Sequence, residues 1–205
     1  FDRGAQPRDH NIDVALRQIA RADRLDELNF ELPLVGGDDP RGPALTRAAI
    51  ADVLQAHGDP YAERLRDPRL RESVRGYLTG SIDLVARTRG ADGEPRFAII
   101  DYKTNRLAGA YRPAALAAEM QRAHYVLQAL LYTVALHRYL RWRLPGYDPE
   151  IHLGGVLYLY LRGMCGPATP SVDGEPCGVF SWRPPAALVG ALSDLLDGAV
   201  PAEVS

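Results

Sequence analysis

Cysteine is scarce in this 205-residue chain, which contains only Cys165 and Cys177. The two cysteines form no CxxC motif and no ligand-spaced cluster with the five histidines, which argues against a structural zinc site or an iron–sulfur cluster. A membrane span needs about 18 consecutive apolar residues, and the sequence has neither such a run nor a signal-peptide pattern at its start. These absences predict a soluble protein in a reduced, cytoplasmic setting without membrane contact.

An excess of positive charge is also missing, because 24 Lys and Arg residues stand against 26 Asp and Glu residues and the net charge is −2. A domain that binds nucleic acid by itself usually carries a basic surface. Any contact with nucleic acid must therefore be local, assisted by a metal, or shared with a partner.

The chain also lacks a starting methionine, and Phe1 opens a polar, turn-rich stretch. We therefore interpret residues 1–23 as the N-terminal segment of a truncated fragment and residues 24–205 as one domain. With 46% apolar residues, a chain of this length can bury roughly 70% of its unfolded surface, so its core needs no disulfide or metal.

Hydrophobic periodicity predicts several helices. A long one runs from Pro113 to about Arg143, is rich in Ala, Leu and Arg, and starts with proline at a favourable first position. Shorter helices are predicted over residues 12–20, 44–58 and 61–73. An amphipathic helix near the end of the chain places three leucines on one face: Leu188, Leu192 and Leu195 or Leu196.

Strand patterns alternate with these helices. Residues 26–34 alternate apolar and polar side chains until Pro33, and residues 76–90 and 96–105 form two strands around a turn that contains Gly and Pro, as in a β-hairpin. Residues 154–164 suit a buried strand, and residues 178–184 can pair with it. The expected fold class is α/β, with the hairpin at the centre of a mixed sheet flanked by the 113–143 helix and the terminal helix.

Three polar residues of the hairpin form a candidate catalytic site. Side chains two apart on a strand share a face, so Asp101 and Lys103 point the same way and Tyr102 points into the opposite layer. If the hairpin is symmetric about Asp92, Asp83 lies directly opposite Asp101. Two carboxylates so close destabilise the fold unless a cation lies between them, and Mg²⁺ favours such oxygen ligands.

An isolated DxK triplet, by contrast, usually marks a solvated strand face. Here the triplet follows the apolar run Phe97–Ile100, which suggests a buried central strand where an unpaired acid would be costly. The second acid at the matched hairpin position favours catalysis over coincidence. In that interpretation Lys103 lies near the scissile phosphate, where it orients or deprotonates the attacking water.

The sequence resembles the C-terminal nuclease domain of the RecB subunit of bacterial helicase–nucleases, a member of the PD-(D/E)xK superfamily. The resemblance runs from about residue 24 to the end and rests on DELNFELPL, GSIDLV, IIDYKTNRL, MQRAHYVLQALLYTVALHRYLR, YDPEIHLGGVLYLYLRGM and GVFSWRP. It implies a restriction-endonuclease-like core and Mg²⁺-dependent endonuclease and exonuclease activity on DNA, with Mn²⁺ or Ca²⁺ able to substitute in binding. It also implies a helicase motor on the same RecB-type chain, RecC- and RecD-like subunits, and a role in double-strand-break repair and recombination.

The resemblance also assigns roles to individual residues. Asp83 and Asp101 match the metal ligands of the family, Tyr102 the residue whose carbonyl joins them, and Lys103 the catalytic lysine. In the long predicted helix, the residues that match the family's DNA-contacting QxxxY motif and the turn before it are Tyr125, Gln128 and Tyr132.

Other residues near these motifs have open interpretations. Glu27 is either a site acid or a salt-bridge partner of Arg24, and Arg162 either meets phosphate or caps a strand end. His124 is more often a satisfied surface histidine than a ligand. Three aromatic residues fit a core better than a base-stacking platform: Tyr158, Tyr160 and Trp182.

Two rival functions are consistent with parts of the pattern. In the family this domain is implicated in loading the RecA recombinase, so a docking module with vestigial chemistry is one alternative, although both acids and the lysine are present. A stand-alone Cas4-like nuclease is the other, but that class needs four cysteines for its iron–sulfur site, and this chain has two.

The resemblance predicts weak activity for the isolated chain. In the family a histidine on a helix upstream of the first matching strand completes the metal shell, and His10 lies in a loop-like PRDHN context instead. Two carboxylates and one carbonyl should bind Mg²⁺ only at millimolar concentration, because Mg²⁺ demands near-octahedral geometry. Extending the chain upstream should tighten metal binding, measured by calorimetry, and raise DNA cleavage. Equal cleavage by the short and extended chains at equal Mg²⁺ would contradict this interpretation.

Overall fold

The computed structural model describes residues 16–35, 37–39, 44–67, 73–74, 76–108 and 110–198. Several predictions therefore lie partly or wholly outside the described residues, including the position of His10, the start of the 12–20 helix and residues 68–72 of the 61–73 helix. Of the first of these helices, the described part is a short 3₁₀ turn over Leu16–Gln18.

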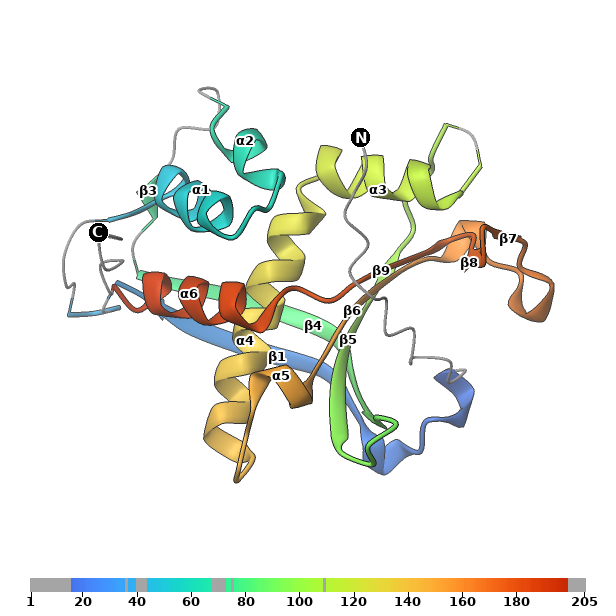
Figure 1. Ribbon diagram of the computed structural model, residues 1–205, viewed down its shortest axis with the longest axis horizontal. Coiled ribbons are helices and arrows are strands. Elements are labelled where there is room, and N and C mark those ends of the chain that lie inside the picture. Colours follow the sequence, from blue (N-terminus) through green and yellow to red (C-terminus); the bar gives the residue numbers. More distant parts are fainter. Residues whose placement is uncertain are drawn as a thin grey trace.

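A five-stranded sheet forms the centre of the fold, in the order β1-β4-β5-β6-β9. Its β5 and β6 strands run parallel, and the other neighbours are antiparallel. The predicted α/β class, with the hairpin in the middle of a mixed sheet, is confirmed (Figure 1). The strands have these bounds: β1 Arg24–Leu34, β4 Gly76–Arg89, β5 Pro95–Lys103, β6 Leu153–Tyr160 and β9 Val179–Trp182.

Strand β1 continues through Pro33 to Leu34, so the prediction that it ends at Pro33 was wrong. Proline cannot donate a backbone hydrogen bond, but an edge strand has a partner on one side only. β1 is an edge of the sheet, and Pro33 pairs in register with Tyr77 of β4. The edge position explains why proline is tolerated there.

The hairpin of β4 and β5 has the predicted register. Leu84 lies opposite Ile100 and Arg89 opposite Pro95, so the pairs are symmetric about Asp92. The turn between them is closed by hydrogen bonds from Gly90 N to Glu94 O and from Gly93 N to Gly90 O, both 2.9 Å. The turn fixes the register, and every side chain on both strands is thereby assigned to a face of the sheet.

Six described α-helices accompany the sheet: α1 Arg47–Ala56, α2 Tyr61–Leu65, α3 Pro113–Arg122, α4 Tyr125–Arg143, α5 Pro149–His152 and α6 Ala186–Leu196. Two small sheets complete the described elements, formed by β2 (Leu45–Thr46) with β3 (Ser73–Val74) and by β7 (Ser171–Val172) with β8 (Glu175–Pro176). None of the described helices is long and apolar enough to cross a membrane.

The long predicted helix over 113–143 is interrupted, so the prediction of one continuous helix was wrong. α3 ends at Arg122, and His124 adopts a left-handed conformation with φ of 58° before α4 begins at Tyr125. A non-glycine residue in this conformation is costly and needs tertiary support. The Tyr61 hydroxyl lies 2.7 Å from Nδ1 of His124, so a contact with α2 holds the break in place.

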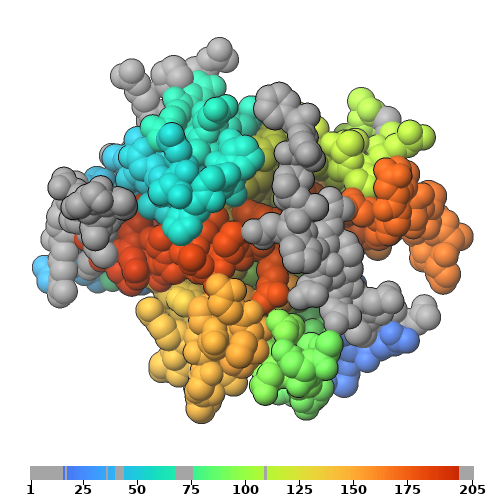
Figure 2. Space-filling view, viewed as in Figure 1, coloured from blue at the N-terminus to red at the C-terminus, as the bar shows by residue number. Residues whose placement is uncertain are grey.

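The main hydrophobic core joins one face of the sheet to α1, α2, α4 and α6. Figure 2 shows α1 packed against α6 on the visible face of the molecule, and α2 packs against α1. The three predicted leucines of the terminal helix are buried in this core, as expected, and so are Tyr158 and Tyr160. A smaller cluster, which includes Leu84, Ile100 and Leu157, lies on the opposite face of the sheet.

A glycine pair allows β6 to lie beside β5. The register of these two strands shifts between Phe97, opposite Leu153, and Ala98, opposite Gly155, so that Gly154 is the extra residue of a bulge. Gly155 has φ of 93°, and a Cβ atom there would lie 2.8 Å from the backbone oxygen of Trp182 in β9. Only glycine fits between β6 and β9 at this position, and a Cβ atom at Gly154 would lie 3.0 Å from the backbone oxygen of Phe97 in β5.

Replacement of Gly155 by alanine should therefore lower the free energy of unfolding by about 1–3 kcal/mol, because it adds backbone strain and a steric clash. Gly190 is a matched control: it lies inside α6 with open space around its Cα, so Gly190→Ala should raise stability by about 0.5–1 kcal/mol. Urea denaturation of the two variants measures both changes, and a shift of the same sign in both would contradict this account of the bulge.

Candidate active site

The two predicted acids lie next to each other across the hairpin. The regular pairing of β4 with β5 ends at Leu84 and Ile100, and Asp83 and Asp101 are the next residues along the two strands. The Oδ2 atom of Asp83 accepts a hydrogen bond of 2.9 Å from the backbone nitrogen of Tyr102. Asp83 is exposed to solvent, whereas Asp101 is 3% exposed. The pair thus combines one accessible and one buried carboxylate.

Asp101 forms a close, buried ion pair with Lys103. The Nζ atom of Lys103 lies 2.6 Å from Oδ1 of Asp101. Burial raises the pKa of Asp101, the neighbouring Lys103 opposes that rise, and the charge of Asp83 adds to it. Two carboxylates beside one ammonium leave a net negative charge, which a divalent cation would offset.

Lys103 is enclosed by residues of α4 and β6. Its Nζ atom donates a hydrogen bond of 3.0 Å to Oε1 of Gln128. The same nitrogen lies 4.1 Å from the ring centre of Tyr125 and 5.0 Å from that of Tyr158, within the range of cation–π attraction. The Tyr158 hydroxyl also donates to Oε1 of Gln128, at 3.1 Å. Buried Tyr158 is therefore a core residue, as predicted, and also a wall of the site.

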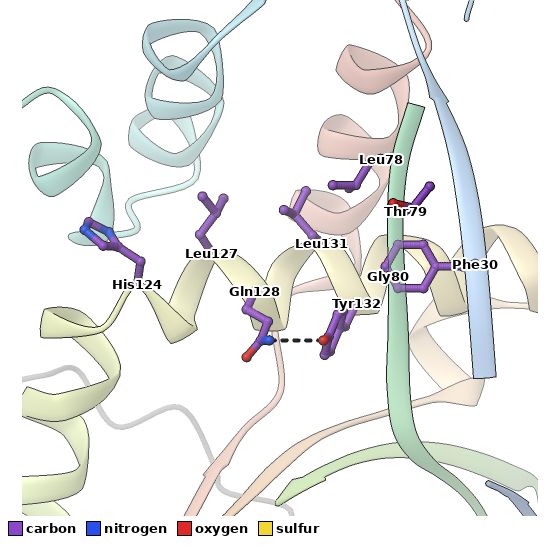
Figure 3. A pocket seen from close by; sticks show the side chains of 9 residues that line it. All are labelled: Phe30, Leu78, Thr79, Gly80, His124, Leu127, Gln128, Leu131 and Tyr132. Atoms are coloured by element: carbon purple, nitrogen blue, oxygen red, sulfur yellow. Dashed lines mark hydrogen bonds between the residues drawn. The ribbon is translucent and has the colours of Figure 1, made fainter. Parts of the chain in front are cut away.

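Gln128 and Tyr132 lie on one face of α4, as their spacing predicted, and are linked by a hydrogen bond of 3.0 Å from Nε2 to the hydroxyl (Figure 3). The Tyr132 ring packs edge-on against Phe30 of β1, with 5.8 Å between ring centres. Both α4 residues line a mostly apolar pocket between α4 and strands β1 and β4, together with Phe30, Leu78, Thr79, Gly80, His124, Leu127 and Leu131 (Figure 3).

Sequence reasoning missed two residues near the site. The amide of Asn105 lies between Glu119 of α3 and Tyr125 of α4, with its Nδ2 atom 3.1 Å from Oε1 of Glu119 and 3.1 Å from the Tyr125 hydroxyl. Glu119 is buried at 6% exposure, and its hydrogen bonds to Arg122 lower its pKa. An acid inside the apolar segment AALAAEM was a visible signal, but its partner could not be identified from sequence.

The structure also shows the surroundings of the three polar residues whose roles the sequence left open: Glu27, Arg162 and His124. Among the described residues Glu27 forms no ion pair with Arg24, and it lies in β1 with φ of 53°, at the interruption of the pairing opposite Asp83. The Arg162 guanidinium donates a hydrogen bond of 2.9 Å to the backbone oxygen of Thr104 and thus holds the segment that follows Lys103. His124 is part of the helix break described above.

The Tyr102 side chain is 39% exposed and points away from Asp101, as strand alternation predicted. Burial and the charges of Asp83 and Asp26 raise the pKa of its phenol. Its backbone, held by Asp83, is the part of Tyr102 that belongs to the site.

The available metal donors are few. The described residues contain no group of three His, Cys, Asp or Glu side chains that could hold a metal ion. Asp83 and Asp101 nevertheless offer two neighbouring carboxylates, and the backbone carbonyl of Tyr102, the residue that follows Asp101 and binds Asp83 through its nitrogen, is a further oxygen donor. Such a set of oxygen donors suits Mg²⁺, which commonly keeps several waters.

Comparison with known proteins places this geometry in a family. The model of the PD-(D/E)XK nuclease superfamily matches residues 5–176. The chain is also similar to the RecBCD enzyme subunit RecB of several bacteria. It is 52% identical over 195 residues to that of Mycobacterium tuberculosis, 51% over 203 residues to that of Mycolicibacterium smegmatis, and 38% over 190 residues to that of Escherichia coli.

These alignments cover 90%, 92% and 90% of this chain but only 18%, 18% and 14% of the respective relatives. The chain thus spans less than a fifth of the length of the relatives it matches. The resemblance to RecB that the motifs indicated is confirmed over most of the chain, and the sheet with its central hairpin agrees with the superfamily match. The chain therefore belongs to the PD-(D/E)XK nuclease superfamily.

Proposed function

We propose that this domain hydrolyses phosphodiester bonds in DNA with the help of Mg²⁺ held by Asp83, Asp101 and the carbonyl of Tyr102. The observation that supports it best is the pair of neighbouring carboxylates, Asp83 and buried Asp101, beside one ammonium, that of Lys103, 2.6 Å from Oδ1 of Asp101. A site built only for stability would not leave this excess of negative charge at a buried position. A divalent cation would offset it.

Each acid has a distinct part in the proposed reaction. Buried Asp101 would hold the cation from within the sheet, and exposed Asp83 would hold it from the solvent side. Mg²⁺ bound there would supply Lewis-acid activation of water and offset charge on the phosphate. The hydrogen bond from the Tyr102 nitrogen to Asp83 keeps the two carboxylates in register.

Lys103 provides the positive charge next to the reacting phosphate. Its ammonium is held by Gln128 and between the rings of Tyr125 and Tyr158. Its position is therefore fixed before the substrate binds. Preorganised charge of this kind stabilises the transition state more than mobile charge does. The ammonium would orient the attacking water, and only the neutral amine form of the side chain could accept a proton from it.

The RecB relatives suggest the wider setting. By analogy with a subunit of the RecBCD enzyme, we propose that the domain works within a cytoplasmic helicase–nuclease, together with RecC- and RecD-like subunits, in repair of double-strand breaks and in recombination. Contact with RecA is part of the same proposal. The near-neutral charge of the chain agrees with DNA contacts that are shared with partners.

Asp83→Ala or Asp101→Ala in the full-length protein should abolish DNA cleavage, because either change removes one of two carboxylate donors. ATP-driven unwinding, which depends on a different part of the protein, should continue. Cleavage of end-labelled DNA in Mg²⁺ and helicase assays on the same preparations measure both activities. Cutting at the parent rate by either variant would contradict the assignment of these acids, and no cleavage by the parent protein would favour the alternative of a non-catalytic docking module that loads RecA.

Lys103→Ala should lower the cleavage rate about 10²-fold or more, since loss of one positioned charge at the transition state costs about 3 kcal/mol. Metal affinity should stay nearly unchanged. Lys103→Arg should restore little activity, because a guanidinium does not act as a base. Single-turnover rates and Mn²⁺ titration separate the two effects, and parent-like cleavage by Lys103→Ala would show that the lysine is structural.

A further inference from the structure

Asn105 connects the segment after Lys103 to two helices. Its Nδ2 atom lies 3.1 Å from Glu119 of α3, and both its amide atoms lie within 3.2 Å of the Tyr125 hydroxyl of α4. The Tyr125 ring in turn lies 4.1 Å from the Nζ atom of Lys103. A continuous chain of contacts therefore runs from a buried carboxylate to the catalytic ammonium.

Glu119, at the far end of this chain of contacts, is held by several hydrogen bonds. Glu119 is buried, and both its carboxylate oxygens accept hydrogen bonds of 2.8 Å from Arg122 one turn later in α3. With Arg122 and Asn105 as donors, this buried charge is compensated where it stands. Because the helix breaks at His124, Glu119 and Tyr125 belong to different helices, yet both bond to the same amide.

The backbone of Asn105 is held as well. Its carbonyl oxygen accepts a hydrogen bond of 3.0 Å from the Tyr111 hydroxyl, and Arg162 binds the carbonyl of Thr104, the residue before it. The amide side chain therefore projects from a fixed point. Its contacts with Glu119 on one side and the Tyr125 hydroxyl on the other leave the Tyr125 ring little freedom to move away from Lys103.

We infer that Asn105 and Glu119 are positioning residues for the nuclease reaction: they fix the Tyr125 ring, which in turn holds the ammonium of Lys103 beside Asp101. Tyr125 then acts mainly as a seat for Lys103 and not as a DNA contact, because its hydroxyl is already engaged by Asn105. This inference rests on the proposed function, since it assigns the network to the same lysine.

The network predicts a kinetic signature that loss of overall stability does not give. Asn105→Ala in the full-length protein should lower kcat by about 10- to 100-fold, because small displacements of a catalytic group have large effects. The affinity for DNA measured without divalent metal should not change. In the Lys103→Ala background, Asn105→Ala should cause almost no further loss, since residues that act through one group are not additive.

A designed rescue tests the contact between Asn105 and Glu119 itself. Asn105→Asp keeps the shape but places two carboxylates together, so cleavage should fall about as far as with alanine. Adding Glu119→Gln supplies an amide donor in the reversed direction and should restore most of kcat. Asn29→Ala, a change of an exposed asparagine on β1, is the matched control and should cleave at the parent rate.

The outcomes separate this inference from the proposed function. If the parent protein cleaves DNA and Lys103→Ala slows it, the proposed function stands. Multiplicative losses in the double variant, a weaker DNA affinity with unchanged kcat, or no rescue by Glu119→Gln would then overturn the positioning role alone. If Asn105→Ala fails to fold, comparing the kcat of Asn105→Asp with that of the double variant Asn105→Asp, Glu119→Gln tests the positioning role instead. Absence of cleavage in the parent protein would overturn both.

Discussion

The antiparallel pairing of β4 with β5 is the constraint on which the rest of the structure depends. A tight turn from Gly90 to Glu94 fixes the register, and a slip of one residue would move Asp83 to the other face of the sheet. The pairing also provides the central strand, β5, against which β6 lies in parallel. The pairing of β4 with β5 thus fixes both the centre of the sheet and the placement of the candidate site.

Placing an acid on the central strand has an energetic cost that the surroundings only partly offset. Asp101 is buried, and burial raises its pKa. Lys103 offsets this cost with an ion pair of 2.6 Å, and the charge of Asp83 opposes it. The remaining negative charge is what would favour a divalent cation at this point.

Lys103 is held in a different way, by side chains that surround its ammonium. Two aromatic rings and one amide surround its ammonium, and they come from α4 and β6. The glutamine of the QxxxY pattern therefore contacts Lys103 directly, and its tyrosine supports that glutamine from one turn away. Residues that the family resemblance connects with DNA thus also form the walls around the Lys103 ammonium.

The sequence by itself determined the strand-forming segments, the hairpin with its symmetric register, and the shared face of Asp101 and Lys103. These features follow from local rules, because side-chain alternation and turn chemistry act over a few residues. Only the tertiary structure decided that the helix breaks at His124, where a hydroxyl from α2 supports a left-handed residue. It alone brought Asn105, Glu119 and Tyr125 together, since contacts between α3, α4 and the segment after β5 depend on packing across distant parts of the chain, which no local pattern encodes.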